Sequence, residues 1–293
     1  SCVSSVINPC DWCSLLDPNS TGGCSITSAT EYTCGCEEEY FWDSSNKCVR
    51  QPKGICTGQD KCYAGFNASG EITCPEEGET IFGQDAQYAE LGYCIPKNFE
   101  IRGSESETTV YDNNLELEWQ QTISADDYTW ANAVSHCEDL EYAGYDDWRL
   151  PSPKELLSIV DNSRHTPAVD TDYFSGSDNL WTSKQYAGNT TKSWYVNFKY
   201  GYSQYASADT PYKVRCVRGT PLPDSIFVET TASNGDVIVT DTVTGLIWQK
   251  TYVTNMWHWA LYYCENLTYA GKNNWPLPNK NELITLINYD RAN

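Results

Sequence analysis

The chain has 293 residues, 40% of them hydrophobic and 13% aromatic, which is enough to build packed cores and predicts roughly two domains with one smaller module. Its net charge of −21 disfavours nucleic acid, heparin-like polyanions and anionic lipid as partners, because these recruit basic patches. No stretch approaches the ~18 apolar residues of a membrane-spanning helix, so no transmembrane segment is predicted. Because the sequence begins at Ser1 without a signal-type segment, we expect a mature, processed chain.

The cysteines indicate an oxidising compartment. Eleven of the 14 lie before residue 100, and such a number is hard to keep reduced in a cytosol. A metal site is the weaker alternative, since the chain has only 3 histidines and none is spaced like a zinc ligand relative to Cys10 and Cys13. The sequence therefore predicts structural disulfides and a secreted, extracellular protein.

Residues 1–50 hold too little apolar sequence to fold without cross-links, and we expect a small disulfide-rich module there. The stretch Tyr32-Thr33-Cys34-Gly35-Cys36, followed by Cys48, resembles the end of an EGF-like module. That resemblance implies three disulfides: Cys10 with Cys24, Cys13 with Cys34, and Cys36 with Cys48. Six cysteines allow fifteen connectivities, so other pairings stay open.

Residues 51–105 are predicted to form a cysteine-containing lead-in segment packed on the next domain. Its cysteines are Cys56, Cys62, Cys74 and Cys94, and we expect Cys62 and Cys74 to be disulfide-bonded. An independent domain is the alternative.

Residues 106–219 alternate between strand and helix patterns. β-Branched and alternating residues on both sides of Asp112-Asn113-Asn114 predict a hairpin. Helical spacing follows over 128–140, with Asp126 or Asp127 expected to cap the helix, and Pro151-Ser152-Pro153 opens a second helix. Strands are expected at 180–183, 193–199 and 212–217. This order predicts an α+β domain.

The motif of residues 119–164 recurs over 248–291. Trp148-Arg149-Leu150-Pro151 recurs as Trp275-Pro276-Leu277-Pro278 and Cys137 as Cys264, at a constant offset of 127 residues. A period of this length is too long for a solenoid, so we expect tandem globular domains. Residues 106–219 are the complete copy, and residues 220–293 are a second, truncated copy with strands near 226–228 and 237–239 and helices over 256–267 and 281–287.

The combined motifs resemble one family. They include Gly245-Leu246-Ile247-Trp248-Gln249, Trp148-Arg149-Leu150-Pro151, Leu180-Trp181-Thr182-Ser183 and Arg215-Cys216-Val217-Arg218. Together they resemble the Lcl C-terminal domain family of bacterial surface proteins, which is similar to the C-type lectin-like superfamily. The match covers residues 106–219 fully and 236–293 in part.

This resemblance implies a disulfide between Cys137 and Cys216. Closing a loop of that length removes about 4 kcal/mol of unfolded-state freedom in the chain-entropy model. Trp148, Leu150 and Trp181 are then expected in the core. A lectin-type calcium site at Asp146 and Asp147 is the weaker alternative, because one carboxylate pair does not supply the ring of oxygens that calcium needs. We expect no cofactor, with an irregular calcium site as the open alternative.

Catalytic patterns are weak, and we expect no enzyme. His136 adjoins a disulfide cysteine, and His165 and His258 stand in no recognisable motif. Glu155 and Glu282 could be imagined as a glycosidase pair, but their repeated position at a helix start favours a capping role.

Binding is the favoured class of function. Residues 194–205 combine aromatic rings with amides and hydroxyls, which suits a glycan or protein surface ligand. The candidate binding residues are Trp194, Tyr195, Asn197, Tyr200, Tyr202, Gln204 and Tyr205. Ordinary sheet packing with exposed tyrosines is the alternative. Some members of the resembled family bind sulfated polysaccharides through basic residues, but a charge of −21 favours neutral glycans or proteins. We therefore expect a cell-surface adhesion protein.

A structural role is the second expectation. The truncated copy would leave an apolar face and open sheet edges, which a longer chain, a cleavage or a neighbouring subunit would explain. Strands supplied by a neighbour would give self-association and a fibre. Cys264 lacks its family partner and Cys2 is left over, so these two are candidates for an intermolecular bond or for free thiols.

Overall fold

The computed structural model describes residues 23–26, 32–35, 40–42, 48–50, 54–64, 70–76, 79, 81–90, 94–273 and 275–291. The chain divides into two compact units, Ser1–Pro52 and Lys53–Asn293. Helices and several small sheets together give a mixed α+β protein. None of the described helices has the length and apolar character needed to span a bilayer.

In the first unit, two short antiparallel hairpins are described by their backbone. Strand β1 (Gly23–Ile26) pairs with β2 (Tyr32–Gly35), and β3 (Tyr40–Trp42) pairs with β4 (Cys48–Arg50). The expected disulfides of this unit fall outside the described residues, since Cys2, Cys10, Cys13 and Cys36 and the side chains of Cys24, Cys34 and Cys48 are not described.

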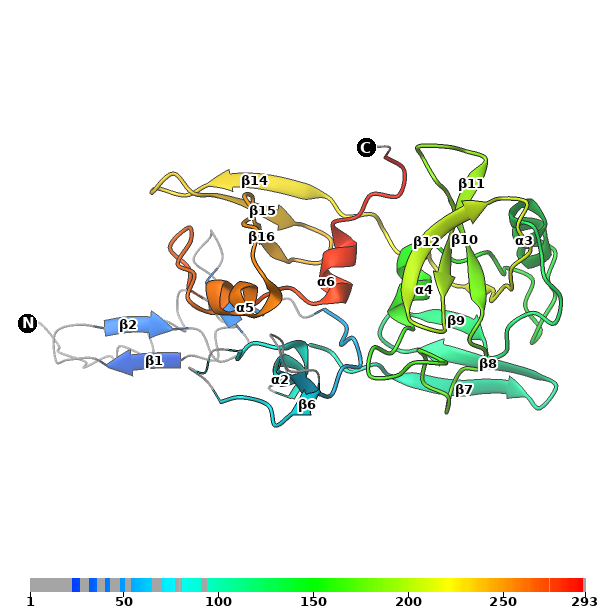
Figure 1. Ribbon diagram of the computed structural model, residues 1–293, viewed down its shortest axis with the longest axis horizontal. Helices are drawn as coiled ribbons and strands as arrows, with labels where there is room; N and C mark the ends of the chain where they lie inside the picture. The colour runs from blue at the N-terminus through cyan, green and yellow to red at the C-terminus, as the bar shows by residue number, and fades with distance from the viewer. Residues whose placement is uncertain are drawn as a thin grey trace, which may run out of the picture. The chain divides into compact units, whose positions relative to one another are not determined.

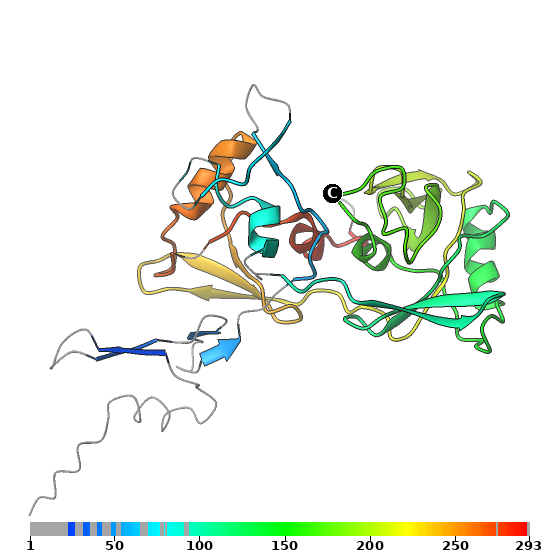
Figure 2. The same cartoon turned by 90° about the horizontal axis from the view of Figure 1, so that it is seen from below.

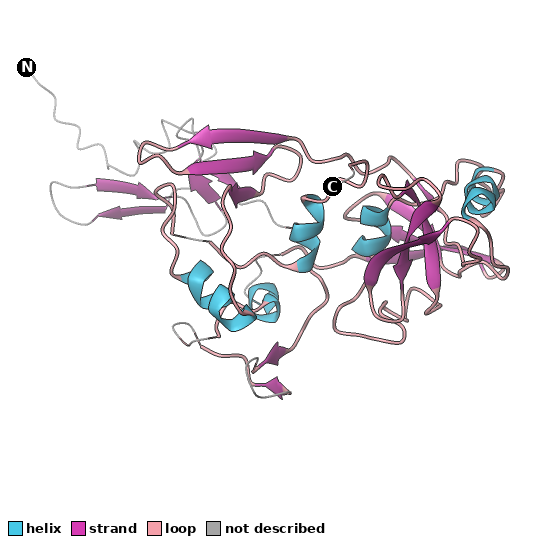
Figure 3. Ribbon diagram, turned by 45° about the horizontal axis from the view of Figure 1, so that its top comes forward, coloured by secondary structure: helices cyan, strands magenta, loops and turns pink. Residues whose placement is uncertain are grey.

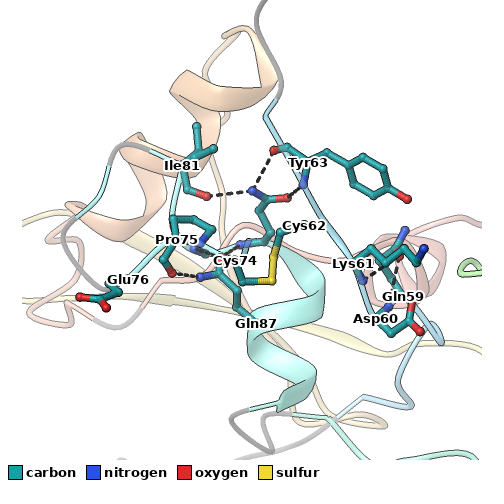
Figure 4. Close-up of a disulfide and its surroundings, with 12 residues drawn as sticks. Gln59, Asp60, Lys61, Cys62, Tyr63, Cys74, Pro75, Glu76, Ile81 and Gln87 are labelled. Atoms are coloured by element: carbon teal, nitrogen blue, oxygen red, sulfur yellow. Dashed lines mark hydrogen bonds between the residues drawn. A yellow bond between two sulfur atoms is a disulfide. The ribbon is translucent and has the colours of Figure 1, made fainter. Parts of the chain in front are cut away.

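The lead-in is cross-linked by disulfides Cys56–Cys94 and Cys62–Cys74. It contains β5 (Cys62–Tyr63), β6 (Glu71–Ile72) and α2 (Asp85–Glu90). Two buried glutamines bond backbone groups of the lead-in. Gln84 bonds the backbone N and O of Tyr63 at 2.8 and 3.0 Å. Gln87 Nε2 donates to Pro75 O at 2.5 Å (Figure 4). These amides satisfy backbone groups that would otherwise be buried without partners.

The lead-in contacts residues 106–219 (the first segment) and residues 220–293 (the second segment). Asn162 Nδ2 donates to Thr57 O at 3.1 Å, and Asn281 Nδ2 donates to Ile55 O at 3.1 Å. Tyr88 OH also donates to the Glu265 carboxylate. The contacts thus reach beyond the adjacent segment, which local sequence patterns do not predict.

A four-stranded antiparallel sheet in the order β13-β9-β8-β7 joins the first segment to the end of the lead-in. Strand β7 (Phe99–Ser104) comes from the lead-in, and the first segment supplies β8 (Glu107–Asp112), β9 (Leu117–Gln120) and β13 (Val217–Arg218). The predicted hairpin is confirmed as β8–β9. Its turn forms because Asp112 Oδ1 accepts from Asn114 N at 2.9 Å and Leu115 N at 3.2 Å.

A second sheet in the order β10-β11-β12 completes this segment. Strands β10 (Asn179–Gln185), β11 (Lys192–Asn197) and β12 (Tyr202–Ser207) are antiparallel. Helices α3 (Trp130–Glu138) and α4 (Pro153–Ser158) lie on different sides of it (Figures 1 and 2).

Two buried clusters hold the segment together. One joins α4 to both sheets and includes Val110, Trp119, Leu156, Leu180 and Val196. The other surrounds the Cys137–Cys216 disulfide and includes Trp148, Leu150, Trp181 and Val214. The core assignment of Trp148, Leu150 and Trp181 is confirmed, because each is at most 4% exposed.

The two helix starts differ from each other. The prediction that Asp126 or Asp127 caps the first helix is wrong: Thr129 is the N-cap and makes no side-chain cap bond, while Asp127 pairs with Lys213 at 3.1 Å. The capping role of Glu155 is confirmed, since Ser152 and Glu155 form a reciprocal capping box at α4.

The second segment repeats the early part of this order. It has β14 (Phe227–Thr231), β15 (Val237–Asp241) and β16 (Ile247–Gln249) in one antiparallel sheet, followed by α5 (Trp257–Glu265) and α6 (Lys280–Thr285) (Figure 3). Asn279 and Glu282 form the capping box of α6, which confirms the capping role of Glu282. Between α6 and residue 291 the described chain contains no strand.

Candidate functional site

The β11–β12 hairpin carries the predicted binding residues, but it divides them between its two faces. Neighbouring residues of a strand point to opposite faces, and directly paired residues share one. Tyr195 pairs with Gln204 and Trp194 pairs with Tyr205. Tyr195, Asn197, Tyr202 and Gln204 therefore share one face, whereas Trp194 and Tyr205 lie on the other.

Tyr195 belongs to the core, which corrects its assignment to a binding surface. Its ring is 7% exposed and packs 4.8 Å from the ring of Tyr212, and its hydroxyl donates to Gln204 Oε1 at 2.8 Å. Burial, together with the nearby Tyr212 and Tyr202, raises the pKa of Tyr195 to about 12. The hydroxyl therefore stays protonated and serves packing.

Asn197 also has a structural role. Its Nδ2 donates to Asn179 Oδ1 at 2.7 Å, and its Oδ1 accepts from Tyr200 N at 2.9 Å. These bonds hold β10 against β11 and shape the turn into β12. The side chain thus positions Tyr200 without being available to a ligand itself.

Trp194 lies in an aromatic cluster on the other face. Its ring centroid is 5.8 Å from that of Tyr186, 5.4 Å from Tyr205 and 5.2 Å from Tyr289. Tyr186 also stacks on Tyr205 at 4.2 Å. Sequence reasoning missed Tyr186 and Tyr289. Tyr186 lies three residues beyond the strand predicted at 180–183 and directly after β10, whereas no local pattern indicates that Tyr289 reaches this sheet.

Tyr200, Tyr202 and Gln204 remain accessible on the first face, and we call them the tyrosine surface. Tyr200 is 59% exposed and Tyr202 is 43% exposed. Their rings are nearly parallel, with an interplanar angle of 8° and centroids 6.5 Å apart. Lys199 Nζ lies 5.2 Å from the Tyr200 ring. Two exposed parallel rings beside an amide suit a ligand with both apolar faces and hydroxyls.

Two arginines of the Arg215-Cys216-Val217-Arg218 stretch bond earlier parts of the first segment. Arg215 is 1% exposed and donates to Gln120 O at 2.7 Å and Gln121 O at 2.6 Å. Burial lowers the pKa of Arg215 to about 9. Arg218 bonds Glu118 at 2.9 Å and Asp147 at 2.6 Å. These contacts are structural.

The sequence matches the family model of the Lcl C-terminal domain over residues 108–218 and 237–293. The chain belongs to the Lcl C-terminal domain family. Among curated proteins no match is found. The first matched stretch of this family runs from β8 to β13 and includes the β10–β12 sheet, and the second begins at β15.

The disulfide implied by the family is present. Cys137 on α3 is bonded to Cys216, with their Cα atoms 5.6 Å apart. Cys264, at the position in α5 that corresponds to Cys137, is free. Burial and the neighbouring Glu265 raise the pKa of the Cys264 thiol to about 11. The thiol is thus protonated at neutral pH, where it is a weak nucleophile.

Two further chemistry-bearing residues of this Lcl C-terminal domain protein, Asp147 and His136, have structural partners. Asp147 is held by Arg218, and His136 stacks on Tyr128 with centroids 4.5 Å apart. Burial lowers the pKa of His136, an effect that the charge of Asp126 opposes. The described residues contain no group of three or more His, Cys, Asp or Glu side chains that could hold a metal ion.

Proposed function

We propose that this Lcl C-terminal domain protein is a secreted bacterial surface protein that acts in adhesion by binding a neutral glycan or a protein surface, and that it is not an enzyme. An EGF-like module would precede two tandem C-type lectin-like copies. Its cross-links are in keeping with an extracellular location, since the described residues include three disulfides.

The observation that carries this proposal is the tyrosine surface. Tyr200 and Tyr202 expose large rings, and the hairpin backbone and the Asn197 side chain hold them in position. Pre-positioned rings bind at a lower entropic cost than mobile ones. With a net charge of −21 on the chain, a neutral ligand is favoured over a sulfated one.

Loss of both rings should weaken binding. The double variant Tyr200→Ala/Tyr202→Ala should lower the affinity for the glycan selected on an array by about tenfold or more, because it removes the stacking surface. Tyr63→Ala is the matched control: this tyrosine is 40% exposed and lies outside the hairpin. Unchanged affinity in the double variant would rule out the tyrosine surface as the binding site.

The exposed face of α6 favours a second candidate function, that of a self-assembling structural subunit. Leu283, Leu286 and Ile287 are 47%, 41% and 42% exposed. The corresponding residues 127 positions earlier, Leu156, Ile159 and Val160, are at most 1% exposed. A second copy of the chain would cover this face by adding strands, as neighbouring subunits do in fibres.

Light scattering tests this candidate. Self-assembly would give masses that are multiples of 33.0 kDa at high concentration, and Leu283→Asp would restore the 33.0 kDa species. Non-reducing electrophoresis would add whether Cys264 links subunits, with Cys2 as its expected partner. A single 33.0 kDa species at every concentration would contradict the structural role.

A further inference from the structure

A groove lies beside the first helix of each segment. The groove beside α3 has a volume of about 430 Å³, and the groove beside α5 has a volume of about 370 Å³. Every residue that lines the second groove follows a lining residue of the first by 127 positions, as Trp259 follows Asn132. Both grooves therefore arise from the backbone arrangement that the two segments share. The side chains that differ between the two linings determine which ligands each groove can bind.

The two linings differ in charge. The α3 groove contains the carboxylates of Asp139 and Glu141. At the corresponding positions the α5 groove has the amide of Asn266 and the hydroxyl of Thr268. Asn255 adds a second amide residue to the lining. The α5 groove thus offers uncharged donors and acceptors, which suit ligand hydroxyls.

The linings also differ in their rings. Asn132 and Ser135 in the α3 groove are replaced by Trp259 and Tyr262 in the α5 groove. Trp259 is 49% exposed and Tyr262 is 48% exposed, and the two rings stand at 87° with centroids 6.0 Å apart. They form two walls at a right angle that are open to solvent.

Hydrogen bonds fix the polar part of the α5 groove. Asn266 Nδ2 donates to Tyr262 O at 2.8 Å, which sets the plane of the amide. Gln249 Nε2 donates to Tyr263 OH at 3.0 Å and holds that ring against the end of β16. A groove whose walls and amide are positioned in advance loses less entropy when a ligand binds.

We infer that the α5 groove is a saccharide-binding site for neutral sugars, separate from the tyrosine surface; this inference rests on the proposed binding function. The apolar face of a sugar ring would stack on Trp259, and its hydroxyls would bond Asn266 and Thr268. A volume of about 370 Å³ lies within the ordinary range of small-ligand sites. The α3 groove, which has two carboxylates and no tryptophan, should not bind the same sugars.

A comparison of three variants of the full chain tests the inference. Each is titrated with every neutral glycan that the unmodified chain binds on a glycan array, because two separate sites can prefer different glycans. Trp259→Ala should weaken binding of at least one of these glycans about tenfold or more, because it removes one wall. Asn132→Ala, at the matching position of the α3 groove, should leave the affinity unchanged. Production in a bacterial periplasm keeps the sequon Asn266-Leu267-Thr268 unmodified.

The tyrosine variant separates the two proposals. If Tyr200→Ala/Tyr202→Ala abolishes binding and Trp259→Ala leaves it intact, the groove inference is overturned while the proposed function stands. If the unmodified chain binds no neutral glycan, both glycan assignments fail. Binding of an anionic glycan that depends on Trp259 would overturn the neutral assignment. Because Trp259 is half exposed, thermal unfolding of its variant should match that of the unmodified chain.

Discussion

Helices α4 and α6 both begin with a capping box, but the apolar face of α4 is buried and that of α6 is exposed. Leu156 and Ile159 on α4 are 0% and 1% exposed, whereas Leu283 and Leu286 on α6 are 47% and 41% exposed. The first segment buries its helix face with β10 and β11, which come later in the chain. Helical periodicity therefore indicates which face can be buried, but partners distant in sequence decide whether it is.

The two capping glutamates, Glu155 and Glu282, also differ in the partners of their carboxylates. The Glu155 carboxylate accepts from Arg149 Nη2 at 2.7 Å and from Leu222 N at 3.1 Å. Pro276 stands at the position that corresponds to Arg149, so the Glu282 carboxylate has no arginine to pair with there and accepts its capping bond from Asn279 N at 2.8 Å. The difference between arginine and proline at this position thus leaves Glu282, among the residues that the structure describes, without the ion pair that Glu155 makes.

Truncating the buried leucine should have the largest effect. Leu156→Ala removes side-chain atoms from a filled core and should lower the free energy of unfolding by about 3 kcal/mol. Leu283→Ala, at the matching position of α6, should change it by less than about 0.5 kcal/mol, because the side chain is half exposed. Denaturant unfolding of both variants measures the difference. If both variants lost the same free energy of unfolding, the α6 face would have to be covered in solution.

The glutamates should give a smaller, pH-dependent effect. Burial raises the pKa of Glu155, but the hydrogen bonds and charge of Arg149 outweigh it and hold the pKa below its ordinary value. Its contribution to stability is therefore present above the unfolded-state pKa and lost as pH falls through the folded pKa. Glu155→Gln should cost about 2 kcal/mol at pH 7 and less at pH 3.

The contribution of Glu282 to stability should depend on pH with the opposite sign to that of Glu155. Burial, together with the charge of Asp85, raises its pKa, an effect that the Asn279 bond opposes. Its contribution is therefore present below the unfolded-state pKa and lost as pH rises through the folded pKa. Glu282→Gln should be neutral at pH 3 and stabilising at pH 7. A loss of stability at pH 7 in Glu282→Gln, measured by the same denaturant titration, would contradict this assignment.

Local sequence was sufficient for much of the fold. The Asp112-Asn113-Asn114 turn and the capping role of both glutamates depend on short-range chemistry, and each was predictable from its residues. The core position of Trp148 and Trp181 was instead implied by the family resemblance. The expected aspartate cap failed because Thr129 takes the N-cap position, and the competing carboxylate of Asp127 is bound by a lysine 86 positions away.

The candidate site was only partly predictable. Residue types alone placed all seven candidates on one surface, but the strand register assigns Tyr195 to the core and Trp194 to an aromatic cluster with Tyr289. The two corresponding grooves are formed by residues separated in sequence by up to 13 positions, from Tyr128 to Glu141 and from Asn255 to Thr268. Their shape depends on how each helix lies against the chain that follows it.

The most direct test of the central claim is a glycan array probed with the unmodified full chain at physiological salt. A protein that uses tyrosine rings and uncharged amides should bind one or more neutral glycans and should not bind sulfated ones, given its net charge of −21. Absence of binding to every neutral glycan, or binding confined to sulfated polysaccharides, would contradict the proposed mode of glycan recognition.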